Sequence, residues 1–140
     1  MKIRKATIKD VKACAKISHV LQLSYLYESS DSQAYQYLKD FVKKGIFFVA
    51  ENNNKIIGFA AAEFMIGNFV WLDGIVVEKH SRGKGIGKLL FKSVFKELKK
   101  RKVSNLFFIA PIKERKTLKF YETLGLKKGN TCVEHYFKIK

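Results

Sequence analysis

The chain has 140 residues and carries 28 Lys and Arg against 12 Asp and Glu, a formal net charge of +16. A chain of this length is expected to form one domain over residues 1–140 and to bury roughly two thirds of its unfolded surface. Its apolar runs are far shorter than the ~20 residues that a membrane-spanning helix requires, which excludes that class of protein. Since the N-terminus shows no apolar signal core, we expect a cytoplasmic protein. Two cysteines without spaced His or Cys partners predict neither a disulfide framework nor a metal site.

The first part of the chain is expected to form one strand and two helices. Residues 1–7 alternate between apolar and polar side chains, which predicts a short half-exposed strand. Residues 10–23 carry apolar side chains at helical spacing, with Asp10 as the expected N-cap. A second helix is predicted over residues 32–44, ending at Gly45 as its C-cap.

Two hairpins are predicted next. Residues 46–51 and 55–66 are rich in β-forming side chains, and Asn52-Asn53-Asn54 between them tolerates positive φ. Gly67-Asn68 then links the second of these strands to a third over residues 69–77. The pattern therefore predicts a three-stranded antiparallel meander.

The last part of the chain alternates again between helices and strands. A helix is predicted from residue 86 to 98, with an apolar face formed by Ile86, Leu90, Phe91, Val94, Phe95 and Leu98. Residues 105–110 are almost wholly apolar, as expected for a parallel strand that is covered on both faces. A helix over residues 114–124 should stop at Gly125, and residues 131–139 alternate as a final strand.

A glycine-rich turn joins the strand at residues 69–77 to the following helix. Glycines at alternate positions lack Cβ atoms where the backbone must turn sharply, so that backbone amides can approach an anion closely. The first turn of the helix adds unpaired N–H groups and the positive end of the helix dipole. The sequence therefore predicts a phosphate-binding loop that consists of Arg82, Gly83, Lys84, Gly85, Ile86, Gly87 and Lys88.

Other glycine motifs fit this loop less well. A nucleoside-triphosphate P-loop requires Ser or Thr where Leu89 stands, and a dinucleotide fingerprint requires glycine where Lys88 stands. An ordinary glycine turn without a ligand remains the alternative.

The positive charge is concentrated in the half of the chain that contains this loop. Residues 71–140 hold 18 Lys and Arg against 6 acids, whereas residues 1–70 hold 10 against 6. An anionic partner such as coenzyme A or a nucleic acid would match this excess. However, 24 of the 28 basic residues are Lys, so that a lysine-rich solvated surface explains it equally well.

Two motifs carry a resemblance to a known family. Arg82, Gly85 and Gly87 fit the pattern Arg-x-x-Gly-x-Gly, which resembles the acyl-CoA signature of the GCN5-related N-acetyltransferases (GNAT). The stretch Phe120-Tyr121-Glu122-Thr123-Leu124-Gly125-Leu126 resembles that family's second landmark, Tyr-Glu-x-Leu-Gly-Phe. The predicted element order is also similar to that of the family. The resemblance covers nearly the whole chain and implies an α/β fold of the α+β three-layer kind, with a mixed, mostly antiparallel central sheet flanked by helices.

The resemblance implies a reaction and a binding mode. Acetyl would pass directly from acetyl-CoA to a primary amine, with no covalent enzyme intermediate. In the family the pantetheine arm lies between two strands that separate, a role that would fall on the backbone of Ile75, Val76 and Val77. The pyrophosphate would be bound by amides of the phosphate-binding loop, and no metal is implied.

Two side chains are the candidate catalytic residues. Tyr121 fills the family's general-acid position, and a phenol with a pKa of about 10 can protonate a leaving thiolate. Asp73 lies where the family's diamine acetyltransferases place a glutamate, and is the candidate base or amine anchor. Deprotonating an alkyl amine at neutral pH costs about 4.6 kcal/mol, so that such an acceptor needs a base. Strand alternation predicts Asp73, Ile75 and Val77 on one face, opposite Leu72 and Val76.

A second class of function stays open at this point. The same fold could retain coenzyme A as a ligand without turnover, or use its basic half to bind an acidic protein or a nucleic acid. No helix-turn-helix or RNA-binding aromatic motif occurs, which argues against a nucleic acid. The sequence does not identify the acceptor amine, and an edge strand near the C-terminus leaves a homodimer open.

Overall fold

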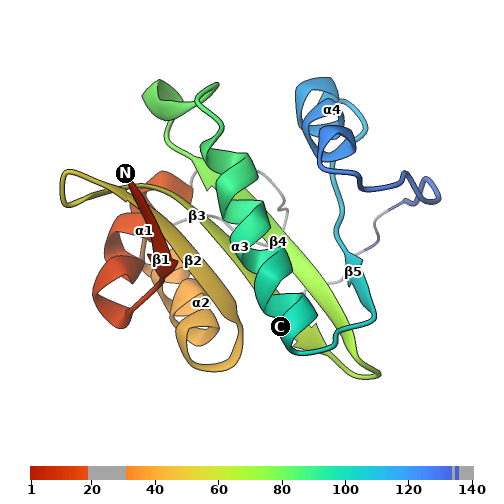
Figure 1. The fold of residues 1–140 in the computed structure, drawn as a ribbon, viewed down its shortest axis with the longest axis horizontal. Coiled ribbons are helices and arrows are strands. Elements are labelled where there is room, and N and C mark those ends of the chain that lie inside the picture. Colours follow the sequence, from red (N-terminus) through yellow and green to blue (C-terminus); the bar gives the residue numbers. More distant parts are fainter. Residues whose placement is uncertain (19–30, 134, 136–140) are drawn as a thin grey trace. The chain divides into compact units, whose positions relative to one another are not determined.

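The structure is a computed structural model that describes residues 1–18, 31–133 and 135. The chain forms two compact units, Met1–Ile109 and Ala110–Lys140. The first unit contains a five-stranded sheet in the order β1-β2-β3-β4-β5 (Figure 1). Its strands are β1 (Lys2–Lys5), β2 (Ile46–Asn52), β3 (Lys55–Met65), β4 (Phe69–Val77) and β5 (Asn105–Phe107). The first three pairings are antiparallel and the pairing of β4 with β5 is parallel.

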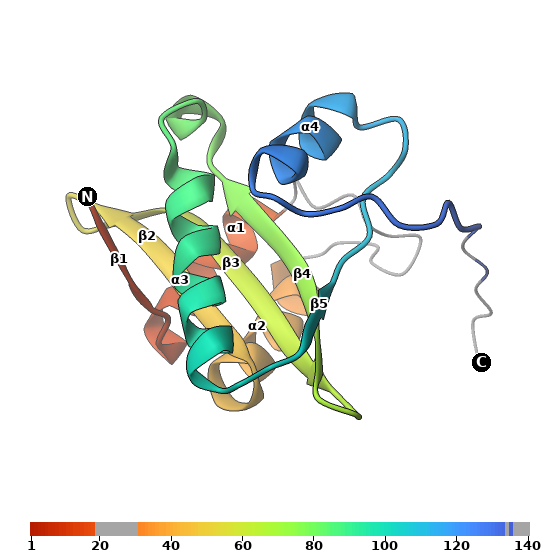
Figure 2. The same cartoon turned by 45° about the vertical axis from the view of Figure 1, so that its right-hand side comes forward.

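Helices cover both faces of this sheet. The short helix η1 (Ile8–Asp10) leads into α1 (Val11–Ile17), which packs with α2 (Asp31–Lys44) on one face. Helix α3 (Ile86–Lys100) crosses the other face, as the turned view shows (Figure 2). The predicted three-layer arrangement around a mixed, mostly antiparallel sheet is therefore confirmed.

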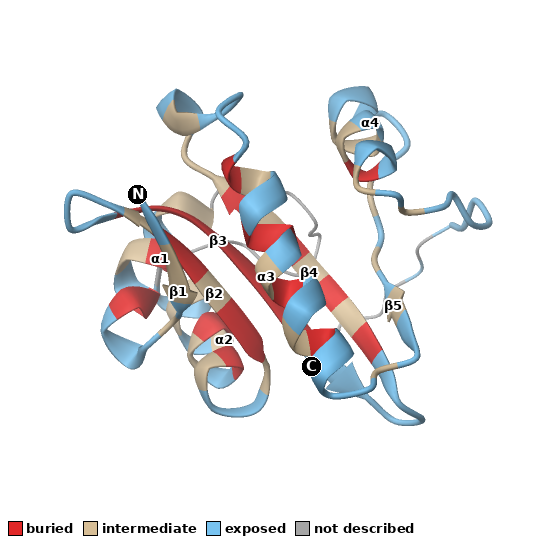
Figure 3. Ribbon diagram, viewed as in Figure 1, coloured by how far each residue is buried: buried red, intermediate tan, exposed pale blue. Residues whose placement is uncertain are grey.

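The core of the first unit lies in two layers, one on each side of the sheet. Buried residues alternate with more exposed ones along β4 and form a stripe on α3 (Figure 3). Between the sheet and the α1–α2 pair, aromatic rings follow one another edge to face from Phe41 to Phe47 and from Phe47 to Phe59. Phe95, which was predicted on the apolar face of α3, is instead 44% exposed beneath the Lys99 ammonium.

Both predicted hairpin turns are present. Asn53 and Asn54 adopt φ values of 48° and 60° between β2 and β3. Gly67 and Asn68 adopt 85° and 64° between β3 and β4. Asparagine and glycine tolerate this left-handed region better than other residues, which is why the turns could be found from composition alone.

Two predicted helix caps form differently. Asp10 precedes α1 but makes no side-chain cap, because its carboxylate accepts bonds from the Arg4 guanidinium and the Thr7 amide. Gly45 follows α2 but has no positive φ. A Cβ there would lie 2.7 Å from the carbonyl oxygen of Ala62, so that close packing explains the glycine. The predicted extension of the first helix to residue 23 lies outside the described residues beyond Ser18.

The apolar stretch at residues 105–110 does not form the long covered strand that its composition predicts. Only Asn105–Phe107 is strand, and these residues pair with Phe69, Val70 and Trp71 of β4. Phe107 and Ile109 remain 51% and 56% exposed. The apolar run therefore predicted the parallel pairing correctly. However, it predicted a longer and more deeply buried strand than the structure contains.

The second unit contains one described helix, α4 (Arg115–Thr123). Gly125 ends it with a φ of 85°, and the Leu126 amide donates to the carbonyl of Tyr121, which confirms the predicted stop. Of the predicted final strand, residues 131–133 and 135 have no regular secondary structure, and the others lie outside the described residues.

Candidate functional site

The glycine loop follows directly from the end of β4. The helical turn η3 (Lys79–Ser81) leads into the loop, and α3 begins at Ile86. Gly83 and Gly85 both have a φ of 76°, whereas Gly87 lies within the helix and has no positive φ. Apart from their immediate neighbours in the chain, no heavy atom of the described residues lies within 4 Å of a Cβ built at Gly83 or Gly85. Backbone conformation therefore requires these two glycines, and the predicted turn role of Gly87 is wrong.

The amides of this loop precede the hydrogen bonds of the helix. The first bond into α3 runs from the Leu89 amide to the carbonyl of Gly85, at 3.1 Å. Amides up to Lys88 belong to the turn whose N–H groups an α-helix cannot satisfy internally, at the positive end of its dipole. Residues 82–85 and Lys88 are exposed, while the buried Ile86 side chain anchors the helix to the core. This arrangement can bind an anion such as a phosphate.

Arg82 fixes the start of the loop. Its Nε donates to the backbone carbonyl of Val77 at 2.9 Å, which ties the loop to the last residue of β4. This bond makes Arg82 a support of the loop conformation, in addition to the predicted contribution of its amide.

Strands β4 and β5 part after three residue pairs. The ladder runs from Phe69 and Asn105 to Trp71 and Phe107. Beyond Trp71, the paired residues described for β4 belong to β3 alone, through to Val77 opposite Gly58. The predicted pantetheine segment, Ile75–Val77, therefore lies where β4 has no paired strand on its β5 side within the described part of the chain. Backbone groups on such an edge can bond an extended ligand.

Asp73 occupies a β-bulge in β4. Ala61 pairs with Gly74 and Ala62 pairs with Leu72, so that Asp73 is an extra residue without a partner on β3. A bulge interrupts strict alternation and redirects a side chain. The prediction that Asp73, Ile75 and Val77 share one face of β4, opposite Leu72 and Val76, is therefore wrong. Leu72 and Val76 pair with Ala62 and Phe59, which are three positions apart on β3 and therefore lie on its opposite faces.

The side chain of Asp73 is bonded to helix α2. The Tyr37 hydroxyl donates to Asp73 Oδ1. Asp73 Oδ2 is buried and accepts no hydrogen bond from any residue that the structure describes. Burial raises the pKa of Asp73 to about 6, against the lowering effect of the Tyr37 bond, and the charge of Glu63 adds to the rise. A carboxyl group with such a pKa can accept a proton near neutral pH.

Tyr121 belongs to the second unit. It lies on α4, is 7% exposed and packs edge to face against Phe120 with ring centroids 5.3 Å apart. Its role as general acid stays a prediction, as do the roles of Asp73 and of the loop residues. Within the first unit the structure does bring together two residues that the sequence left unconnected, Tyr37 and Asp73. Their contact spans 36 residues, and no local pattern indicates it.

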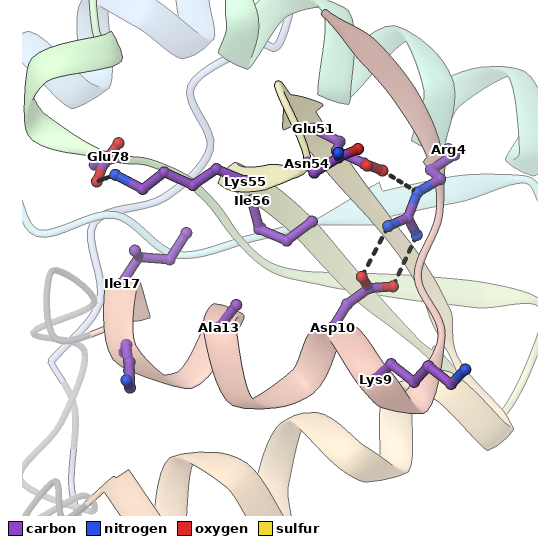
Figure 4. A pocket seen from close by; sticks show the side chains of 11 residues that line it. Arg4, Lys9, Asp10, Ala13, Ile17, Glu51, Asn54, Lys55, Ile56 and Glu78 are labelled. Atoms are coloured by element: carbon purple, nitrogen blue, oxygen red, sulfur yellow. Dashed lines mark hydrogen bonds and ion pairs between the residues drawn. The ribbon is translucent and has the colours of Figure 1, made fainter.

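A separate cleft of about 470 Å³ lies at the other edge of the sheet, between β1, α1 and the β2–β3 hairpin. Figure 4 shows the Arg4 guanidinium bonded to Asp10 and Glu51. On the opposite wall, Lys55 pairs with Glu78 at 2.7 Å. These charges are already paired with one another, which makes the cluster a structural feature of the first unit.

The Arg4–Asp10 pair predicts a pH-dependent contribution to stability. The hydrogen bond from Arg4, with support from Thr7, lowers the pKa of Asp10 from 3.8 to about 2. A lowered pKa stabilises the fold at pH values above 3.8, and this contribution disappears as the pH falls toward 2. We expect Asp10→Asn to cost about 2 kcal/mol in the free energy of unfolding at pH 7.

Urea denaturation of both proteins from pH 7 to pH 2 measures this effect. Asp40→Asn provides the control, because Asp40 is exposed on α2. If the free energy of unfolding of Asp10→Asn stays below that of the wild type by the same amount down to pH 2, the Arg4–Asp10 pair is not the source of the pH dependence.

No group of three or more His, Cys, Asp or Glu side chains within residues 1–18, 31–133 and 135 could hold a metal ion. Among the helices in these ranges, none is both long and apolar enough to cross a membrane.

Comparisons with known proteins identify the family. The model of the acetyltransferase (GNAT) family matches residues 15–126. No curated protein matches the sequence significantly. Among solved structures, a possible acetyltransferase from Clostridium difficile 630 aligns with a TM-score of 0.82 and 19% identity, over 99% of this chain and 98% of that one.

Two further structures show the same fold. The aminoglycoside antibiotic 6′-N-acetyltransferase of Acinetobacter haemolyticus aligns with a TM-score of 0.80 and 17% identity over 100% of both chains. The PaiA N-acetyltransferase of Thermoplasma acidophilum, in complex with coenzyme A, aligns with a TM-score of 0.79 and 20% identity, over 94% of this chain and 92% of that one. With its family model covering more than half of the sequence and its sheet order and glycine loop as described, the chain belongs to the GNAT family of acetyltransferases.

Proposed function

We propose that this protein transfers the acetyl group of acetyl-CoA to a primary amine, and that residues 1–140 act as one N-acetyltransferase domain. The observation that carries the proposal is the loop between β4 and α3. Two left-handed glycines open to solvent precede a helix start whose amides are available to an anion. Such a loop is suited to a pyrophosphate, which acetyl-CoA supplies.

The neighbouring strand edge supports the same donor. The loop would bind the pyrophosphate through amides of residues 82–88, and the β4 edge at Ile75–Val77 would bond the pantetheine arm. The excess of basic residues in the second half of the chain favours an anionic cosubstrate. The Thermoplasma relative was solved in complex with coenzyme A, which makes coenzyme A the first ligand to test.

The reaction needs one base and one acid. The acceptor enters as an ammonium ion and gives a proton to Asp73, after which its nitrogen lone pair forms the new C–N bond at the acetyl carbon. The C–S bond breaks with its electron pair on sulfur, and Tyr121 protonates the thiolate. The nitrogen loses a second proton, which restores Tyr121, while Asp73 releases its proton to solvent. The products are an acetamide and free CoA thiol.

The need for a base depends on which amine is the acceptor. An acceptor with an alkyl amine depends most on a base, since its deprotonation at neutral pH costs about 4.6 kcal/mol. One of the structural relatives is an aminoglycoside acetyltransferase, so that aminoglycosides join polyamines, amino acids and short peptides in the acceptor panel.

The test is release of free thiol from acetyl-CoA with each amine of the panel. We expect one class of acceptor to release thiol and to gain the mass of an acetyl group. If acetyl-CoA binds but no amine turns over, the protein is a coenzyme A-binding module. If acetyl-CoA does not bind at all, the assignment of the loop is wrong.

A further inference from the structure

The bond between Tyr37 and Asp73 joins two elements that the proposed reaction has not yet used together. Tyr37 lies on α2 and Asp73 at the bulge of β4, so that the bond links a helix to the strand that precedes the phosphate-binding loop. The ring of Tyr37 packs edge to face on Phe41, with centroids 5.1 Å apart. Phe41 is buried and continues into the aromatic series of the core. The hydroxyl is therefore held by a packed ring rather than by a mobile side chain.

The two oxygens of the Asp73 carboxylate are in different situations. Oδ1 accepts the Tyr37 bond, whereas Oδ2 is buried and has no donor among the described residues. Buried carboxylate oxygens in folded proteins are normally paired, because an unpaired one loses its hydration without compensation. Fixing Oδ1 also fixes where Oδ2 points. This pattern fits a carboxylate whose second oxygen is kept for a ligand.

The surrounding charge selects the kind of ligand. Among the described residues, the titratable groups that act on Asp73 are Tyr37 from α2 and Glu63 from β3. Neither is a cation, and Glu63 adds a second negative charge. A positively charged donor gains from both carboxylates, whereas an anionic ligand would be repelled. An ammonium group carries three N–H donors and a positive charge. It can therefore donate a hydrogen bond to Oδ2 and is attracted by both carboxylates.

We propose that Tyr37 is a positioning residue that fixes the Asp73 carboxylate through Oδ1 and thereby presents Oδ2 to the ammonium group of a cationic acceptor amine. This inference rests on the proposed acetyl transfer and narrows its acceptor to amines that are protonated at neutral pH. Asp73 is the group that meets the substrate, and Tyr37 acts through it.

The kinetic test compares Tyr37→Phe with Tyr35→Phe. Tyr35 lies two positions away on the same helix, is half-buried and has no part in the proposed site, so that it controls for loss of a hydroxyl on α2. We expect Tyr37→Phe to lower kcat/KM for a cationic acceptor about 10-fold, the effect of one hydrogen bond to a charged group. The KM for acetyl-CoA should stay unchanged, and Tyr35→Phe should resemble the wild type.

The pH profile separates positioning from a structural effect. The wild type should lose kcat/KM as the pH falls through about 6, where Asp73 takes up a proton. Because the Tyr37 bond lowers the pKa of Asp73, its removal should move this acidic limb to higher pH. A Tyr37→Phe profile that coincides with that of the wild type would overturn the proposal.

The charge of the acceptor is tested with two simple amines. Butylamine is protonated at pH 7 and aniline is neutral. We expect Asp73→Asn to reduce turnover or binding of butylammonium strongly and to change aniline little. Equal losses for both amines would show that Asp73 does not recognise the ammonium charge.

A measurement on the free protein keeps the test independent of turnover. Titration of ¹³C-labelled aspartate by NMR should give Asp73 a pKa near 6 in the wild type, a higher value in Tyr37→Phe and no change in Tyr35→Phe. Absence of thiol release with every amine would reject the proposed transfer, yet the titration and butylammonium binding would still decide the inference. An Asp73 pKa that does not respond to Tyr37→Phe would reject the inference alone.

Discussion

Replacing Tyr121 with phenylalanine should lower kcat about 100-fold or more while the KM for acetyl-CoA changes little. The physical reason is the leaving group. A thiolate expelled from the tetrahedral intermediate needs a proton, and a positioned acid typically contributes 10²–10⁴-fold to such a step. A 100-fold loss corresponds to about 2.7 kcal/mol of activation free energy. Phenylalanine keeps the ring that is buried in the second unit, so that the fold should persist.

Steady-state thiol release together with the thermal unfolding temperature distinguishes catalysis from packing. Tyr35→Phe serves again as the matched loss of a hydroxyl. We expect the unfolding temperature of Tyr121→Phe to remain near that of the wild type while kcat falls. Should kcat stay unchanged while the unfolding temperature drops, Tyr121 is a packing residue and the acid must be sought elsewhere.

Local signals of the sequence predicted the architecture well. Asn53, Asn54, Gly67 and Asn68 marked both hairpins because their positive φ angles depend on residue type and hardly on distant neighbours. The glycine loop was found for the same reason, and Gly83 and Gly85 indeed adopt left-handed φ. The helix after the loop was likewise marked by local apolar spacing, whereas the parallel strand was marked by a continuous apolar run that is longer than the strand itself.

Features that depend on contacts between different segments of the chain could not be predicted from the sequence. The bulge at Asp73 exists only because β3 and β4 shift register between Ala61 and Ala62, and strict alternation assumes that no such shift occurs. The Tyr37 bond follows from how α2 packs on the sheet, which no spacing records. Asp10 was expected to cap a helix, but its carboxylate accepts hydrogen bonds from the guanidinium of Arg4, which lies on β1. The partner of a charged side chain is thus determined by which residues the fold brings close to it.

The second large effect is expected at Gly85. We predict that Gly85→Val raises the Kd for acetyl-CoA about 100-fold. A valine at a φ of 76° is strained by roughly 1–2 kcal/mol, and we expect its branched side chain to crowd a phosphate that approaches the neighbouring amides. Each lost amide bond to a charged phosphate adds about 1.5–3 kcal/mol. Since no atom of the described residues, apart from the chain neighbours of Gly85, lies within 4 Å of the added Cβ, the protein without ligand should still fold.

Gly129→Val is the matched control, because Gly129 also has open space around its Cβ position but no positive φ. Gly85→Asn separates the two causes, since asparagine tolerates the left-handed region yet retains a Cβ. Calorimetric titration with acetyl-CoA should rank affinity as wild type and Gly129→Val first, Gly85→Asn next and Gly85→Val last. A folded Gly85→Val protein with unchanged Kd would mean that these amides do not hold the pyrophosphate. Because the loop carries the proposed function, that single result would remove coenzyme A from this site, whereas the predicted ranking would tie the left-handed glycine directly to the binding of the donor.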